Sequence, residues 1–325
     1  MAAKQQEESM FIAFISILFG LGLLYLGAEG LVRGSSNLGL RFGISPLVVG
    51  LTIVAFGTSA PELAVSMNAA HMGQTDVSIA NVVGSNIANI GLILGISAMV
   101  QPIKIDIKLI RIDIPIMIAS TLFFCFLIMD TVISHLDGMF LVTGVITFTL
   151  FNIIKSRDAR PIAHEIYEQN IPISKNGASK DILFIIAGLV ILTLGGRILV
   201  DGAVQIARLF GISEAVIGLT IIAVGTSLPE LATSVLAAAR KMSEISVGNI
   251  VGSNIFNIFS VLGLSAILEP LPIGNVQWVD VAVMVMFTLA VLPLARSGFV
   301  LSKKEGFLFF ICYVGYVGWL ASVAM

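Results

Sequence analysis

The residues of this chain best suited to chemistry are two glutamates, Glu62 and Glu230, each inside an otherwise apolar stretch. Each closes the same six-residue motif, GTSAPE from Gly57 and GTSLPE from Gly225. A charge at the centre of a bilayer costs about 3 kcal/mol or more, so an ionisable residue there indicates a functional site. A proline inside a helix removes one N–H and clashes with the carbonyl four residues back. The motif therefore predicts two broken helices, each with a carboxylate beside freed backbone oxygens.

A second duplicated motif, GSNIAN from Gly84 and GSNIFN from Gly252, follows the first in each copy. Its Ser and last Asn are four residues apart and share one helix face. If the two helices of each copy pack face to face, every ligand is a hard oxygen. Such oxygens with two negative charges suit Ca²⁺ and could also hold Na⁺, and without Cys or His they argue against zinc, copper or iron.

Neither motif contains Lys or Arg, so the protein supplies no counter-charge to the two glutamates. Carboxylates in a low dielectric then need a cation or protons. An empty site is costly and an exchange of cations is not, which favours an exchange mechanism. For single Ser and Asn residues a structural role stays open, because such side chains often only bond neighbouring membrane helices. This applies above all to the pairs Asn81/Asn249 and Asn86/Asn254.

The composition indicates a polytopic membrane protein. Of 325 residues 57% are hydrophobic and 12% charged, with a mean hydropathy of +1.01. Soluble domains carry about 25% charged residues. The net charge of −2 gives no reason to expect nucleic acid as a partner, and the two cysteines do not indicate a disulfide framework. We expect no cofactor and no obligate protein partner.

The fold class we predict is an all-α polytopic membrane protein of ten transmembrane helices. Apolar runs of about 20 residues can span a bilayer, and the candidate spans fall near 10–38, 45–71, 77–100, 110–129, 136–154, 181–209, 214–239, 245–268, 279–295 and 306–323. They divide the chain into a first repeat of five helices (1–154), a polar linker (155–180) and a second repeat of five helices (181–325), with helices 2 and 7 broken.

The two halves are related by an offset of 168 positions. Residues 42–95 align with 210–263 without a gap, with roughly 31 identities in 54 positions. Because each repeat has an odd number of helices, the second copy is expected to enter the membrane upside down. Lys and Arg collect on the cytoplasmic side of membrane proteins. With both termini outside and the 155–180 loop cytoplasmic, only Lys4, Arg197 and Arg208 of the 18 basic residues lie outside.

Two pairs of opposite charges also repeat at this offset. Glu29 and Arg33 are four residues apart, and so are Arg197 and Asp201, with the signs reversed. Such spacing predicts ion pairs along one helix. The long, glycine-bearing helices that carry them, 1 and 6, are our candidates for moving elements.

The duplicated motifs closely resemble the α-repeats of the sodium/calcium exchanger family, within the cation/calcium antiporter superfamily. The resemblance covers the helix count, the inverted halves and both motif pairs, and so most of the chain. The proton/calcium branch is similar in fold but typically has a G-N-x-x-E pattern where this chain has G-T-S-x-P-E.

The resemblance implies a role for each matching residue. Glu62 and Glu230 would be central carboxylates shared by Ca²⁺ and Na⁺, with backbone oxygens of Thr58 and Thr226 added to the Ca²⁺ site. Flanking Na⁺ sites would use the hydroxyls and carbonyls of Ser59, Ser227, Ser85, Ser253, Ala55 and Ala223. Asn89 and Asn257 would line the middle. Relatives often carry Asp at one of these two positions, and potassium-dependent relatives look acidic there, so two Asn make potassium co-transport less expected.

The function predicted is therefore a secondary antiporter that exchanges Na⁺ for Ca²⁺ by alternating access, and not an enzyme. A proton-coupled cation antiporter using the same two glutamates is the alternative. A cation channel would be an alternative from another functional class, and the inverted repeat argues against it.

Overall fold

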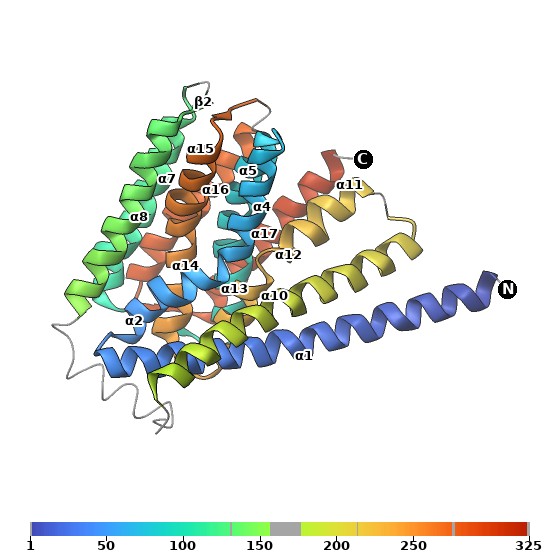
Figure 1. Ribbon diagram of the computed structural model, residues 1–325, viewed down its shortest axis with the longest axis horizontal. Helices are drawn as coiled ribbons and strands as arrows, with labels where there is room; N and C mark the ends of the chain where they lie inside the picture. Colours follow the sequence, from blue (N-terminus) through green and yellow to red (C-terminus); the bar gives the residue numbers. More distant parts are fainter. Residues whose placement is uncertain (1, 131, 157–176, 213, 275–276, 324–325) are drawn as a thin grey trace.

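The computed structural model describes residues 2–130, 132–156, 177–212, 214–274 and 277–323. It is almost entirely helical (Figure 1). Its first half contains α1 (Ala2–Phe42), α2 (Pro46–Val49), α3 (Ala55–Thr58), α4 (Ala60–His71), α5 (Thr75–Ala88), α6 (Gly95–Val100), α7 (Ile114–Leu127) and α8 (His135–Ser156). Two π-helical segments, η1 (Gly50–Val54) and η2 (Asn89–Leu94), join successive α-helices without a loop, and a third, η3 (Leu109–Asp113), leads directly into α7.

The second half has the same order of elements, except that none of its described π-helical segments corresponds to η3. It contains α10 (Ala178–Leu209), α11 (Glu214–Ile217), η5 (Gly218–Ile222), α12 (Ala223–Gly225), α13 (Leu228–Ala239), α14 (Ser243–Phe256), η6 (Asn257–Leu262), α15 (Gly263–Leu268), α16 (Trp278–Arg296) and α17 (Lys303–Val323). Most of these elements begin 168 residues after their counterparts. The predicted linker 155–180 lies largely outside the described residues.

The described residues include eight helices long and apolar enough to cross a membrane, and a ninth span if one bent pair is counted. The bent pair joins Pro46–Thr58 to Ala60–His71 at an angle of 43°. Its break falls at Ser59, two residues before Pro61, as the motif predicts. The predicted span 214–239 is interrupted in the same place, and its longest apolar helix is the 12-residue α13. An apolar all-α membrane fold is thus confirmed, whereas ten full-length spans are not.

Two short strand pairs hold the halves together. β1 (Ile103–Lys104) pairs with β4 (Val300–Leu301), and β2 (Val132–Ile133) pairs with β3 (Leu271–Pro272), both antiparallel. Adding 168 to the residue numbers of β1 gives those of β3, and adding 168 to those of β2 gives those of β4. The two pairings are therefore copies of one contact made reciprocally between the halves.

The helices α1 and α10 lie side by side and away from most of the other helices (Figure 1). Their contact is too close for side chains at some positions: a Cβ on Gly27 would lie 2.7 Å from the backbone nitrogen of Leu192 and 2.8 Å from the carbonyl oxygen of Gly188. Buried Leu24 and Leu31 of α1 then share a small apolar cluster with Leu192 of α10. The larger core joins α5, η2 and α7 to α14, η6 and α16.

Candidate functional site

Both glutamates lie in the first turn of a helix that starts at the break. Ser59 (φ −78°, ψ 3°) separates α3 from α4, and Glu62 follows in the first turn of α4 behind Pro61. Ser227 (φ −86°, ψ 6°) precedes α13 and Glu230 in the same way. Proline is tolerated in a first turn, where its missing N–H has no intrahelical partner to lose. The positive end of the helix dipole there favours a carboxylate.

The two carboxylates are bonded crosswise between the halves. The hydroxyl of Ser227 donates to Glu62 Oε1 at 3.2 Å, and the hydroxyl of Ser59 donates to Glu230 Oε1 at 3.1 Å. Both glutamates are only 1% exposed. Among the described residues, their Oε2 atoms have no hydrogen-bond partner and no Lys or Arg forms an ion pair with them. Each buried glutamate therefore bonds to a serine of the other half, and its Oε2 atom remains available to a cation.

The second motif brings further oxygens to the same place. Ser85 Oγ lies 3.4 Å from Ser227 Oγ. Asn89 begins η2, which packs against α13, and Asn257 begins η6, which packs against α4. Asn89 Oδ1, Asn257 Oδ1 and Ser253 Oγ are buried with no hydrogen-bond partner in the described part of the chain. The structure thus gathers the predicted glutamates, serines and asparagines at the crossing of α4, α5, α13 and α14.

The π-helical segments at this crossing were not predicted. Both η2 and η6 begin at the last Asn of the GSNIxN motif. A π-helical turn carries an extra residue and changes the direction in which the following side chains point, and such turns are frequent at functional sites. Because an apolar helix and an apolar π-segment have similar residue patterns, periodicity offered no signal for them.

Buried and partly buried polar side chains also form hydrogen bonds next to the two motifs. Thr58 Oγ1 lies 3.2 Å from Asn249 Oδ1, and Asn249 Nδ2 donates to Ser234 Oγ at 2.9 Å. In the other half Asn81 Nδ2 donates to Ser66 Oγ at 2.9 Å and to the Glu62 carbonyl at 3.2 Å. Sequence analysis left Asn81 and Asn249 open and missed Ser66 and Ser234. The sequence did contain a signal for Ser66 and Ser234, because each lies four residues after a motif glutamate and the two serines are 168 positions apart.

The two halves of the site differ in how tightly they are closed. Ala55 is fully buried, and a Cβ on Gly252 would lie 2.7 Å from Ala55 Cβ. At the equivalent positions Ala223 is exposed, and a Cβ on Gly84 would meet no described atom within 4 Å. Thr58 is likewise buried, whereas Thr226 is partly exposed and its hydroxyl has no hydrogen-bond partner among the described residues. The helices therefore pack more closely beside the first motif than beside the second.

The carbonyls of the breaks differ in a related way. The N–H of Ser59 donates to the Ala55 carbonyl at 3.0 Å, four residues back. The N–H of Ser227 donates instead to Val224, three residues back, at 3.1 Å. The Ala55 carbonyl also accepts from the Thr58 hydroxyl at 3.4 Å, whereas the Ser227 N–H does not bond the Ala223 carbonyl.

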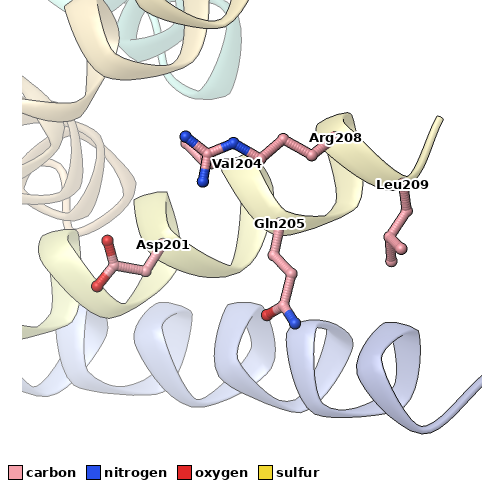
Figure 2. Close-up of a pocket in the computed structure, with 5 residues that line it drawn as sticks. All are labelled: Asp201, Val204, Gln205, Arg208 and Leu209. Atoms are coloured by element: carbon pink, nitrogen blue, oxygen red, sulfur yellow. The ribbon is translucent and has the colours of Figure 1, made fainter. Parts of the chain in front are cut away.

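The predicted ion pairs have different outcomes. Arg33 pairs with Glu29 as expected, and Glu29 also pairs with Arg240 at the end of α13. No ion pair between Arg197 and Asp201 is present in the described structure. Asp201 instead lines a hollow of about 450 Å³ along α10 with Val204, Gln205, Arg208 and Leu209 (Figure 2). None of these residues belongs to the glutamate site.

This arrangement can hold hard cations. Within the described residues, no group of three or more His, Cys, Asp and Glu side chains is placed to bind a metal ion. A cation here would depend on two carboxylates together with hydroxyl, amide and carbonyl oxygens. Such all-oxygen sets suit Ca²⁺ and Na⁺.

Comparison with known proteins gives consistent relatives. The family model described as sodium/calcium exchanger protein matches residues 12–154 and 180–321. The sodium/calcium exchanger MaX1 of Methanosarcina acetivorans is 32% identical, covering 94% of this chain and 97% of its own. The putative antiporter CaxA of Alkalimonas amylolytica is 37% identical, covering 94% and 98%. Structures of the sodium-calcium exchanger NCX_Mj match with a TM-score of 0.80 at 33% identity, over 95% of this chain and 98% of that one.

Proposed function

This chain belongs to the sodium/calcium exchanger family, whose members are antiporters and not enzymes, and we propose that it exchanges Na⁺ for Ca²⁺ at a central site built on Glu62 and Glu230. The observation that carries the proposal is the crosswise bonding of the two buried glutamates to Ser227 and Ser59. This bonding brings both acids and both hydroxyls close together between the halves, which supports one shared site.

The chemistry of the site favours exchange. A buried charge without a partner costs several kcal/mol, so two bare carboxylates oppose the empty state. One Ca²⁺ or a set of Na⁺ ions relieves this cost equally well in terms of charge. Replacing one cation set by the other is therefore easier than leaving the site empty, which couples the two ion flows.

We assign the remaining ligands by the same logic. The hydroxyls of Ser59, Ser85, Ser227 and Ser253 and the carbonyls of Ala55 and Ala223 would hold Na⁺ beside the glutamates. Backbone oxygens of Thr58 and Thr226 would join the Ca²⁺ site. Asn89 and Asn257 would line its middle as neutral ligands, which disfavours potassium co-transport.

We further propose that residues 1–154 and 181–325 are inverted five-helix repeats joined by a cytoplasmic linker, 155–180. The strand pairs support the inversion. The span formed by η3 and α7 separates β1 from β2, so the two pairs lie at opposite ends of that span. A rotation that exchanges the halves also exchanges these ends, because it converts β1–β4 into β3–β2. Ten spans then require that the region from α11 to α13 crosses the membrane as one interrupted helix.

The orientation we propose places both termini outside a cell membrane. Arg41 before α2 and Arg240 after α13 then lie on the cytoplasmic side, following the bias of Lys and Arg. Ala223 lies on the outer side of Glu230 and Ala55 on the inner side of Glu62. Since Ala223 is exposed and Ala55 buried, we propose that the present conformation is open to the outside. Access would alternate as α1 and α10 move together against the other helices.

Transport into proteoliposomes tests this function. We expect Ca²⁺ uptake into vesicles loaded with Na⁺ and none into vesicles without it. Glu62→Gln and Glu230→Gln should each abolish uptake, because each removes one of the two charges that bind the cation. Glu269→Gln is the matched control, since Glu269 is exposed at the end of α15, and it should transport normally.

The same assay separates the competing functions. Uptake driven by an outward proton gradient without Na⁺ would assign the protein to the proton-coupled class. Ca²⁺ flux without any counter-ion would indicate a channel. Full activity of either glutamine variant would exclude the two-glutamate site.

A further inference from the structure

Asn86 is a fully buried asparagine that the ligand assignment above does not use. It lies on α5 between the two motif residues Ser85 and Asn89. Its amide contacts the opposite half twice. Asn86 Nδ2 donates to the backbone carbonyl of Asn254 at 3.3 Å, and Asn86 Oδ1 accepts from Asn257 Nδ2 at 3.1 Å.

These two bonds have a fixed direction. A backbone carbonyl can only accept, so the end of the Asn86 amide that faces Asn254 must be its NH₂ group. The oxygen of Asn86 is thereby turned toward Asn257 and can only accept in its turn. The NH₂ group of Asn257 must then point at Asn86, which leaves the Asn257 oxygen as the free end of the chain of bonds.

The free end is the atom that a cation needs. Asn257 is fully buried, and its Oδ1 has no hydrogen-bond donor in the described structure. If the amide were reversed, its NH₂ group would replace that oxygen and repel a cation. The two orientations of an amide have almost the same shape, so packing alone does not select between them.

We propose that Asn86 is a positioning residue that holds the amide of Asn257 with its oxygen toward the transported cation. This inference rests on the proposed function, in which Asn257 is a ligand. Asn86 itself touches no ion. The Asn254 carbonyl can only accept a hydrogen bond, so it fixes the orientation of the Asn86 amide. Asn86 in turn fixes the orientation of the Asn257 amide in the binding site.

The duplicated chain offers a matched control. Asn254 is the counterpart of Asn86, but its Nδ2 donates at 2.7 Å to the carbonyl of Ile250 in its own helix. Its Oδ1 accepts no hydrogen bond from any described residue, so it does not orient Asn89 in the same manner. Asn254→Ala keeps the backbone carbonyl that Asn86 uses.

The test measures Ca²⁺ binding to the purified full-length protein through the rise in its unfolding temperature with added Ca²⁺, a readout that needs no transport. Loss of an outer partner of a metal ligand typically costs 10–100-fold in affinity. We therefore expect Asn86→Ala to weaken the apparent Ca²⁺ affinity by about tenfold. Asn86→Leu, which retains more of the buried volume, should do the same, and Asn254→Ala should change the affinity by less than about threefold.

An Asn257→Asp background distinguishes orientation from a merely structural role. A carboxylate presents an oxygen at either end and needs no orienting partner. Asn86→Ala should therefore cost no further affinity in that background. An equal loss in both backgrounds, or no loss in the native one, would overturn the inference. Neither result would affect the proposed function, which fails only if the native protein shows no Na⁺-dependent Ca²⁺ uptake.

Discussion

At the scale of single residues, the site depends on serines that act across the halves. Ser59 and Ser227 each donate to the glutamate of the other motif copy. Hydrogen bonds to a charged group contribute about 1.5–3 kcal/mol, more than neutral ones. Once a bound cation neutralises the carboxylate, the lone pairs of the same hydroxyl oxygens can bind Na⁺.

We expect Ser59→Ala and Ser227→Ala to raise the Na⁺ concentration for half-maximal exchange by about tenfold, because each removes one ligand and one charge-assisted bond. The measurement is Na⁺-dependent Ca²⁺ flux at a series of Na⁺ concentrations. Ser120→Ala is the control: Ser120 is equally buried but donates to the Met117 carbonyl in its own helix, at 2.8 Å. An unchanged Na⁺ dependence in both motif variants would contradict the role of these hydroxyls.

At the scale of helices, close packing determines which elements can move as one body. The contact between α1 and α10 leaves no space for a side chain at Gly27. Glycine is unfavourable in a helix interior by about 1 kcal/mol relative to alanine, so its presence there must be compensated by packing. The two helices thus form a closely packed pair, within an apolar cluster that also includes residues of α2, η1, α13 and α14.

Gly27→Ala should destabilise the protein by about 1–3 kcal/mol, because the added methyl group meets backbone atoms that cannot move aside. Thermal unfolding in detergent measures the effect. Gly22 lies on the same helix and a Cβ there would meet no described atom within 4 Å. Gly22→Ala should leave the unfolding temperature unchanged or raise it slightly. Equal effects of the two substitutions would show that the helix pair is looser than described.

At the scale of the whole molecule, a nearly symmetric chain adopts an asymmetric conformation. The strand pairs and crosswise bonds are reciprocal, but the helices are closed beside Ala55 and open beside Ala223. Exchange of these two local packings between the halves would convert one access direction into the other. Because the same residues line both, the two conformations can have similar energies.

The conformation predicts which side of the site is accessible. In a protein whose Cys125 and Cys312 are replaced by Ala, Ala223→Cys should react with a membrane-impermeant thiol reagent added outside, and Ala55→Cys should not. We expect Ca²⁺ to slow the labelling at position 223, because the ion occupies the adjacent site. Labelling of Ala223→Cys only by a reagent on the cytoplasmic side would reverse the proposed orientation.

The sequence by itself determined the class of fold, the duplication and the identity of the two glutamates. The sequence signals for these features are local: apolar runs indicate membrane spans, a proline indicates a break in a helix, and a carboxylate in an apolar run indicates a functional site. The family followed from the same motifs and was confirmed by the relatives of the chain.

Only the tertiary structure decided which residues meet. That Ser59 bonds Glu230 and not Glu62, and that Asn86 orients Asn257, depends on how the halves pack, and a repeat in sequence does not specify its partner in space. The π-helical segments at Asn89 and Asn257 arise from side-chain packing that apolar periodicity does not encode. The open and closed sides of the site are likewise undetermined by two almost identical motifs, because identical residues allow either half to be the closed one.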